Sequence, residues 1–129
     1  MRILLDTHVL IWALAQPRRL SQDTREAITD PQNDVFFSAG SIWEIAIKTQ
    51  LRRIELSIEP VAIAKEAVAS GFQELPIRAS AAARVAELPL HHRDPFDRIL
   101  VAQALCEPAK LFTADAALVP YSDLVTLIK

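Results

Sequence analysis

The chain has 129 residues, of which 51 % are hydrophobic and 23 % charged, so it is long enough to fold around its own core and too apolar for a disordered protein. Its 14 Lys and Arg against 16 Asp and Glu give a formal charge of −2, which excludes nucleic-acid binding by bulk positive charge and leaves a local patch or a metal ion as the means. The single cysteine excludes an internal disulfide, and apolar runs stay short of the roughly 18 residues of a membrane span. We therefore expect one domain over residues 1–129, located in a reducing cytoplasm and not in a membrane.

In chain order, the first expected element is a buried strand, because the aliphatic run Ile3–Leu5 is ended by a polar residue. Asp6 can cap a helix that continues to Ala15, and Pro17 ends it. Small residues at 38–41 predict a turn. The other elements of the first half are expected at residues 21–28 (helix), 35–37 (strand) and 42–51 (helix).

In the second half, Pro60 suits the first position of a helix and Gly71 the position just past its end. Pro76 leaves open where a third strand, at residues 73–77, ends. The later elements are expected at residues 80–87 (helix), 95–105 (helix opened by Asp94-Pro95), 110–113 (strand), 115 onward (short helix) and 124–128 (edge strand). Aliphatic strands that alternate with helices predict an α/β fold, a parallel sheet with helices on both faces.

Four acidic residues lie just after the expected strands or early in the helices that follow: Asp6, Glu44, Asp97 and Asp115. Ligands of open parallel sheets bind beyond the carboxyl ends of the strands, so we expect these acids to converge there. Carboxylates that lie close together repel one another, and a divalent cation removes that repulsion. Mg²⁺ and Mn²⁺ prefer hard oxygen ligands, so the pattern predicts a site for one of them.

Each acid also has an explanation without a metal. Asp6 and Asp115 can cap helices, and Asp97 can complement a helix dipole. Glu44 can form a surface pair with Lys48, four residues on. The almost wholly apolar neighbours of Glu44 instead indicate a buried acid, which needs a partner and favours a functional role.

Four segments in this order resemble a PIN-domain ribonuclease, and in particular the VapC-type toxins of bacterial toxin–antitoxin pairs. The resemblance extends from the first strand to the last. The segments are Ile3-Leu4-Leu5-Asp6-Thr7-His8, Ser41-Ile42-Trp43-Glu44-Ile45-Ala46-Ile47-Lys48, His91-His92-Arg93-Asp94-Pro95-Phe96-Asp97-Arg98 and Phe112-Thr113-Ala114-Asp115.

This resemblance implies a PIN-like three-layer fold and an endoribonuclease that cuts single-stranded or loop RNA with Mg²⁺ or Mn²⁺. It also implies a homodimer and a small antitoxin protein whose tail enters the cleft. The catalytic and metal-binding acids would be Asp6, Glu44, Asp97 and Asp115, with Thr113 as the hydroxyl residue of the late motif and Thr7 and Ser38 as polar neighbours. Loops at residues 106–110 and 121–124 depart from the family pattern, which bears on the rim of the groove and not on the acids.

Several residues near these motifs have more than one interpretation. Arg98, beside Asp97, can hold that acid's orientation or bind a phosphate oxygen. His91 and His92 are adjacent and point opposite ways in an extended segment, so we expect loop residues, with RNA contact left open. Trp12 and Trp43 are expected in the core. The dipeptide at 52–53 (Arg-Arg) is expected to lie at a solvated helix end, with phosphate contact as the alternative. The polar stretch around it is too short to separate two domains.

Two other functions fit part of the sequence. A receiver-type signalling domain has a parallel sheet and an acid after the first strand, but it needs a pair of acids there and a lysine late in the chain, and here Asp6 stands alone. A non-catalytic interaction module would use the acids only as helix caps and the apolar surface for binding. Metal-induced stabilisation would separate this module from a nuclease.

Overall fold

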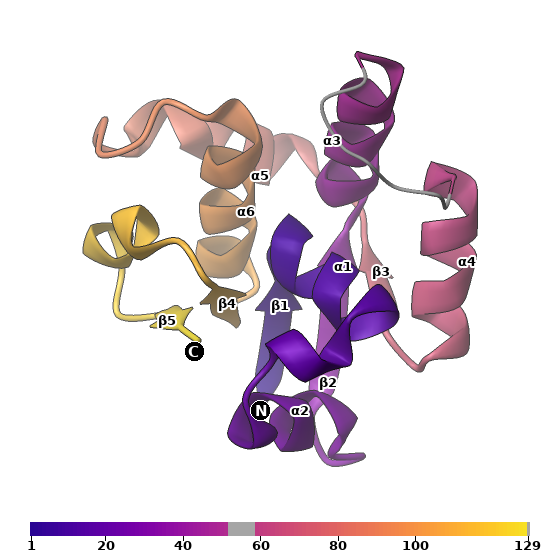
Figure 1. Cartoon of the computed structure of the whole chain (residues 1–129). Coiled ribbons are helices and arrows are strands. Elements are labelled where there is room, and N and C mark those ends of the chain that lie inside the picture. Colours follow the sequence, from indigo (N-terminus) through magenta and orange to yellow (C-terminus); the bar gives the residue numbers. More distant parts are fainter. Residues whose placement is uncertain (52–58, 129) are drawn as a thin grey trace.

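In the computed structural model, which describes residues 1–51 and 59–128, five parallel strands form one sheet in the order β3-β2-β1-β4-β5 (Figure 1). The strands are β1 (Arg2–Leu5), β2 (Asp34–Ser38), β3 (Gln73–Leu75), β4 (Lys110–Thr113) and β5 (Val125–Leu127). The α-helices are α1 (Thr7–Ala15), α2 (Gln22–Thr29), α3 (Ala39–Gln50), α4 (Pro60–Ala69), α5 (Ala79–Arg84) and α6 (Pro95–Cys106). Short 3₁₀ helices are η1 (Pro17–Arg19), η2 (Val85–Glu87) and η3 (Ala116–Tyr121).

Alternate residues of the central strands enter two separate hydrophobic cores. Ile3 and Leu5 of β1 pack with residues of α1 to α4 on one face of the sheet. Leu4, between them, packs with Leu100 and Val101 of α6 on the other face. Because both faces are buried, the strands are continuous apolar runs and not alternating ones. The expected α/β fold with helices on both faces of a parallel sheet is confirmed.

The strands and most of the helices lie within a few residues of the expected ranges, and the differences have local causes. The expected turn at 38–41 is wrong, because the Ser38 side chain caps α3 and the helix already starts at Ala39. Strand β3 ends at Leu75, directly before Pro76. The expected helix at 80–87 divides into α5 and η2, and the short helix after Asp115 is of the 3₁₀ type.

The two tryptophans differ from each other. Trp12 is partly buried against the first core, as expected. Trp43 is 59 % exposed, so its expected place in the core is wrong. Its ring instead meets the ring of Phe96 edge-on, with 5.1 Å between the centroids. The Arg-Arg dipeptide at 52–53 lies outside the described residues.

Parallel pairing places the carboxyl ends of all five strands at the same edge of the sheet. The chain moves from β1 to β2 and β3 on one side, and β4 lies on the other side of β1. This reversal of direction beside β1 is where open α/β sheets form their binding crevice. Asp6, Ser38 and Thr113 stand at the carboxyl ends of β1, β2 and β4.

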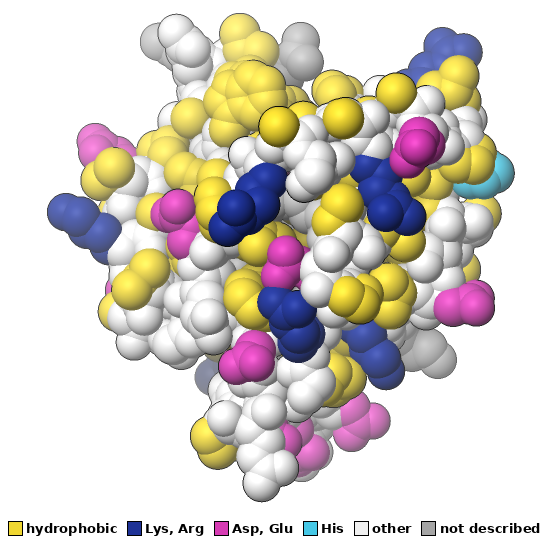
Figure 2. All heavy atoms as spheres, turned by 180° about the vertical axis from the view of Figure 1, so that it is seen from behind, with side chains coloured by type: hydrophobic (Ala, Val, Ile, Leu, Met, Phe, Trp, Pro, Cys, Tyr) yellow, Lys and Arg dark blue, Asp and Glu magenta, His cyan; other side chains and the backbone are white. Residues whose placement is uncertain are grey.

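The surface opposite to the view of Figure 1 carries basic and acidic side chains interspersed with apolar ones (Figure 2). Over that face the two charge signs are mixed, in keeping with the formal charge of −2. Among the described residues, no helix combines the length and the apolar character needed to cross a membrane.

The packing of α6 on the sheet gives a test of the fold. Leu100 has no exposed surface in the second core, so Leu100→Ala is expected to lower the free energy of unfolding by about 2–5 kcal/mol. Val119→Ala, at a side chain that is 42 % exposed, is expected to cost less than about 0.5 kcal/mol. Urea denaturation followed by circular dichroism measures both, and equal losses would contradict the assigned core.

Candidate functional site

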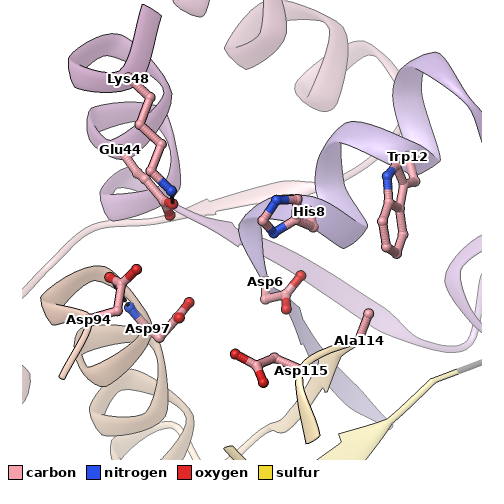
Figure 3. A pocket seen from close by; sticks show the side chains of 9 residues that line it. All are labelled: Asp6, His8, Trp12, Glu44, Lys48, Asp94, Asp97, Ala114 and Asp115. Atoms are coloured by element: carbon pink, nitrogen blue, oxygen red, sulfur yellow. Dashed lines mark hydrogen bonds and ion pairs between the residues drawn. The ribbon is translucent and has the colours of Figure 1, made fainter. Parts of the chain in front are cut away.

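A pocket of about 380 Å³ opens at the carboxyl edge of the sheet (Figure 3). The four acids expected to converge all line it: Asp6 follows β1, Glu44 comes from α3, Asp97 from α6, and Asp115 follows β4. Its other lining residues are His8, Trp12, Lys48, Asp94 and Ala114. The topology thus brings together carboxyl groups that are far apart in the sequence.

Asp6 is buried, and its two oxygens have different partners. Oδ1 accepts a hydrogen bond of 2.8 Å from the backbone N–H of Val9, which makes Asp6 the cap of α1. Oδ2 accepts from the hydroxyl of Thr113. Burial raises the pKa of Asp6, and the hydrogen bonds from Thr113 and Val9 act in the opposite direction. The capping role and a place in the pocket are therefore compatible, since each carboxylate oxygen has a second lone pair.

Glu44 is only 3 % exposed, as its apolar neighbours predicted. The Thr7 hydroxyl donates to Glu44 Oε1 over 2.7 Å and is also hydrogen bonded to Ser41. The ammonium group of Lys48 forms an ion pair with Oε2 of Glu44. Burial alone would lower the pKa of Lys48, but the hydrogen bond and charge of Glu44, together with the charges of Asp94 and Asp97, raise it overall.

Ser38 and Thr113 hold the strand ends beside the pocket. The Ser38 hydroxyl accepts from the Gly40 N–H (2.9 Å) and donates to the side-chain oxygen of Gln103 on α6. The Thr113 hydroxyl accepts from the Asp115 N–H over 3.0 Å while it donates to Asp6. Both hydroxyls thus fix elements that carry the acids, and neither lies in the pocket lining.

Asp97 shows the strongest effect of the clustered charges. Burial and the negative charges of Asp94, Glu44 and Asp6 raise the pKa of Asp97 to about 7, and His92 acts in the opposite direction. Asp94 caps α6 by accepting from the Phe96 and Asp97 N–H groups. Neighbouring carboxylates therefore disfavour the ionised form of Asp97, and a bound cation would favour it.

His92 contacts two acids of the site, a role that the sequence, which predicted loop residues with RNA contact left open, did not assign to it. Its Nε2 lies 3.1 Å from Asp115 Oδ2 and 3.3 Å from Asp97 Oδ2. Ligand atoms of these three side chains lie within 4.8 Å of one another. The adjacent His91 instead packs edge-on against Tyr121. The sequence placed both histidines near Asp94 and Asp97, but it held no signal for which of them faces the acids.

Arg98 is buried, and its guanidinium group is hydrogen bonded to other groups of the protein. It donates to the carbonyl groups of Pro89 and Val85 at 2.9 and 3.0 Å, and to the Tyr121 hydroxyl at 3.1 Å. Arg98 therefore lies outside the pocket lining and stabilises the segment that leads into α6. Contact with the carboxylate of Asp97 or with a phosphate is not the role that its hydrogen bonds indicate.

The pocket suits a hard divalent cation. Besides Asp94, which caps α6, four carboxylates line it, and those of Asp6, Glu44 and Asp97 are largely buried. Oxygen donors of this kind are preferred by Mg²⁺ and Mn²⁺. Lys48 pairs with Glu44, but the other carboxylates that line the pocket leave negative charge in excess, and the charges of Asp94, Glu44 and Asp6 add to the effect of burial in raising the pKa of Asp97. A cation among the carboxylates would remove this excess.

The pKa of Asp97 gives a prediction for the metal-free protein. The folded-state pKa lies near 7, above its ordinary value of 3.8. Ionisation of Asp97 is therefore less favourable in the folded than in the unfolded protein, so the free energy of unfolding falls as the pH rises between these two values. Asp97→Asn removes the charge and is expected to raise the Tm above that of the parent by several degrees at pH 8, with little or no gain at pH 4. Thermal unfolding in EDTA measures this, with Asp23→Asn at an exposed acid of α2 as the control. A gain for Asp97→Asn that does not change with pH would contradict the assignment.

Comparisons of the amino-acid sequence with known proteins identify a family and a relative. The PIN domain family model matches residues 3–122. The chain is 34 % identical over 117 residues to Ribonuclease VapC22 of Mycobacterium tuberculosis, covering 90 % of this chain and 88 % of the relative.

Two solved structures share the fold. VapBC2 from Rickettsia felis, in a crystal structure bound to a DNA fragment from their promoter, matches with a TM-score of 0.75 and 13 % identity, over 100 % of both chains. FitAcB from Neisseria gonorrhoeae matches with a TM-score of 0.63 and 19 % identity, over 97 % of this chain and 96 % of the other. With the family model and the curated relative, these findings show that the chain belongs to the PIN-domain family.

Proposed function

We propose that this protein is a divalent-metal-dependent endoribonuclease, the VapC-type toxin of a toxin–antitoxin pair. The observation that carries this proposal is the convergence of Asp6, Glu44, Asp97 and Asp115 on one pocket. The relative of 34 % identity is named as a ribonuclease, which supports RNA as the substrate. Family membership supports the nuclease class.

The four carboxylates would hold one or two divalent ions, Mg²⁺ or Mn²⁺. When bound, such an ion polarises the phosphoryl oxygen and generates a hydroxide from water near neutral pH. The acidic pocket of a chain with a formal charge of −2 would in this way accept a phosphodiester without a large basic surface.

The protein's own residues hold the acids in place. Thr113 and the Val9 N–H fix the two oxygens of Asp6, and Thr7 and Lys48 fix those of Glu44. Carboxylates that are held in this way need little rearrangement when substrate binds. The ammonium group of Lys48 lines the pocket and reduces the repulsion that an incoming phosphate meets.

The two alternatives from the sequence have less support. The PIN-domain family match argues against a receiver-type signalling domain, for which the sequence offered only a parallel sheet and one acid. A non-catalytic module would use the acids as caps, and Asp6, Asp94 and Asp115 do cap helices. Glu44 has a partner in Lys48 in either case, but helix capping does not explain why these carboxylates lie in one pocket, where the pKa of Asp97 is raised.

A small antitoxin protein and a second copy of this chain are the proposed protein partners. Large apolar side chains available for such contacts include Trp43, Val61 and Leu90, which are 59 %, 63 % and 83 % exposed. A basic side chain of the antitoxin would complement the acidic pocket. A cytoplasmic location stays a prediction from the lone cysteine and from RNA as substrate.

Asp6→Asn tests the proposed activity. The substitution keeps the hydrogen-bond geometry near Val9 but removes a negative ligand. It is expected to lower RNA cleavage at least about 100-fold, equivalent to about 2.7 kcal/mol of transition-state stabilisation. Cleavage of a fluorescent single-stranded RNA in Mg²⁺ or Mn²⁺ measures the rate. Asp23→Asn, at an exposed acid away from the pocket, is the control and should cut like the parent. Parental activity in Asp6→Asn would contradict the assignment.

Metal binding is expected to stabilise the parent protein. At about a hundredfold excess over its Kd, a bound ion adds roughly 2.7 kcal/mol to the stability of the folded state. Differential scanning fluorimetry should therefore show a higher Tm in millimolar Mn²⁺ or Mg²⁺ than in EDTA, and Asp6→Asn should lose most of the shift. An unchanged Tm at saturating metal would instead favour the non-catalytic module.

A further inference from the structure

We propose that His92 is a positioning residue of this site: its Nε2–H donates to the carboxylate of Asp115 and holds it beside Asp97, ready for the cation, without itself binding the ion. The proposal rests on the proposed function in one respect, which is that the pocket binds a divalent metal. It assigns a role to a residue that was expected in a loop, with RNA contact as the open alternative.

The tautomer of His92 is set by a backbone contact. The N–H of Asp94 donates to Nδ1 of His92 over 3.1 Å, so Nδ1 must present its lone pair. The ring proton of the neutral imidazole therefore lies on Nε2. This nitrogen lies 3.1 Å from Asp115 Oδ2, to which its proton is donated, and 3.3 Å from Asp97 Oδ2.

A protonated nitrogen has no lone pair for a metal. Direct ligation by Nε2 would require the proton to move to Nδ1, where it would face the Asp94 N–H. The cluster of three ligand atoms within 4.8 Å is therefore better explained as two carboxylates beside a hydrogen-bond donor than as a histidine-containing metal site. In agreement with this, His92 is not among the residues that line the pocket.

The backbone of His92 is tied to the two elements that carry these carboxylates. Its N–H donates to the Tyr121 hydroxyl over 2.9 Å, and its carbonyl accepts from the same hydroxyl at 3.3 Å and from Arg98 at 3.4 Å. Arg98 belongs to α6, as Asp97 does, and Tyr121 ends η3, which Asp115 caps. Ring and backbone of His92 thus both connect α6 with η3.

This connection matters most for Asp115. Its side chain is 44 % exposed, and one of its oxygens already caps η3 through the Ala117 N–H. The contact with His92 orients the other oxygen toward Asp97. Removal of the donor is expected to leave the fold intact and to let the Asp115 carboxylate take several orientations, which weakens metal binding.

The tautomer can be observed directly in the metal-free protein. Long-range ¹H–¹⁵N correlation spectra of ¹⁵N-labelled protein distinguish a proton on Nε2 from one on Nδ1, and His92→Gln identifies the signals. The proposal requires the Nε2–H tautomer. A proton on Nδ1, or a Mn²⁺-loaded protein whose electron spin-echo spectrum shows ¹⁴N coupling that disappears in His92→Gln, would overturn it.

Variants at this position test the consequence. In calorimetric titrations with Mn²⁺, His92→Ala and His92→Asn should bind the ion about 10-fold or more weakly than the parent. The side chain of Asn is too short to place its amide where Nε2 lies. His92→Gln can place an amide N–H where Nε2 lies and should recover most of the loss. His91→Ala, which disturbs the packing on Tyr121 without removing the donor, is the matched control and should bind like the parent.

The outcomes separate this proposal from the proposed function. Parental Mn²⁺ affinity in His92→Ala, or losses of equal size in His91→Ala and His92→Ala, would overturn the role of His92 and leave the nuclease assignment standing. Equal losses in His92→Asn and His92→Gln would also overturn it. A parent protein that binds no Mn²⁺ would instead refute the metal-dependent function itself, and the role of His92 with it.

Discussion

Mutual repulsion of carboxylates at one edge of the sheet is the constraint on which the rest of this structure depends. Asp6, Glu44, Asp97 and Asp115 line one pocket, where burial and the neighbouring negative charges together raise the pKa of Asp97 to about 7. A fold selected only for stability would separate these groups or replace them. Their retention in one place is explained when an ion occupies the space among them.

The surrounding polar groups limit the repulsion and set the direction of each acid. Hydroxyl groups of Thr7 and Thr113 donate to Glu44 and Asp6, and these hydroxyls come from the helix and the strand next to the pocket. Lys48 neutralises part of the charge of Glu44. Donors of this kind hold the carboxylates without filling the pocket, so the fold prepares the site before metal or substrate arrives.

The sequence predicted the parts of the site that follow from topology. Asp6 and Asp115 follow strands whose aliphatic runs are clear, and parallel strands end at one edge. The burial of Glu44 could be predicted from its apolar neighbours, and Asp97 from its place early in α6. These features depend on local pattern and strand direction, which are readable without coordinates.

Other features depend on contacts between distant segments, and the sequence did not predict them. His92 faces the acids because Tyr121 and Arg98 bind its backbone, and no local pattern records which of two adjacent histidines does so. Trp43 is exposed because its side of α3 meets Phe96 and solvent, not the core. Helix α3 starts early, at Ala39, because the side chain of Ser38 caps it, whereas the sequence predicts a turn at Ser38.

The central claim is that these carboxylates share a cation, and diffraction from crystals soaked in Mn²⁺ tests it most directly. An anomalous difference peak is expected in the pocket, within coordination distance of oxygens of Asp6, of Asp97 and of either Glu44 or Asp115. Peaks confined to other parts of the surface at saturating Mn²⁺, with the four carboxylates unliganded, would contradict it.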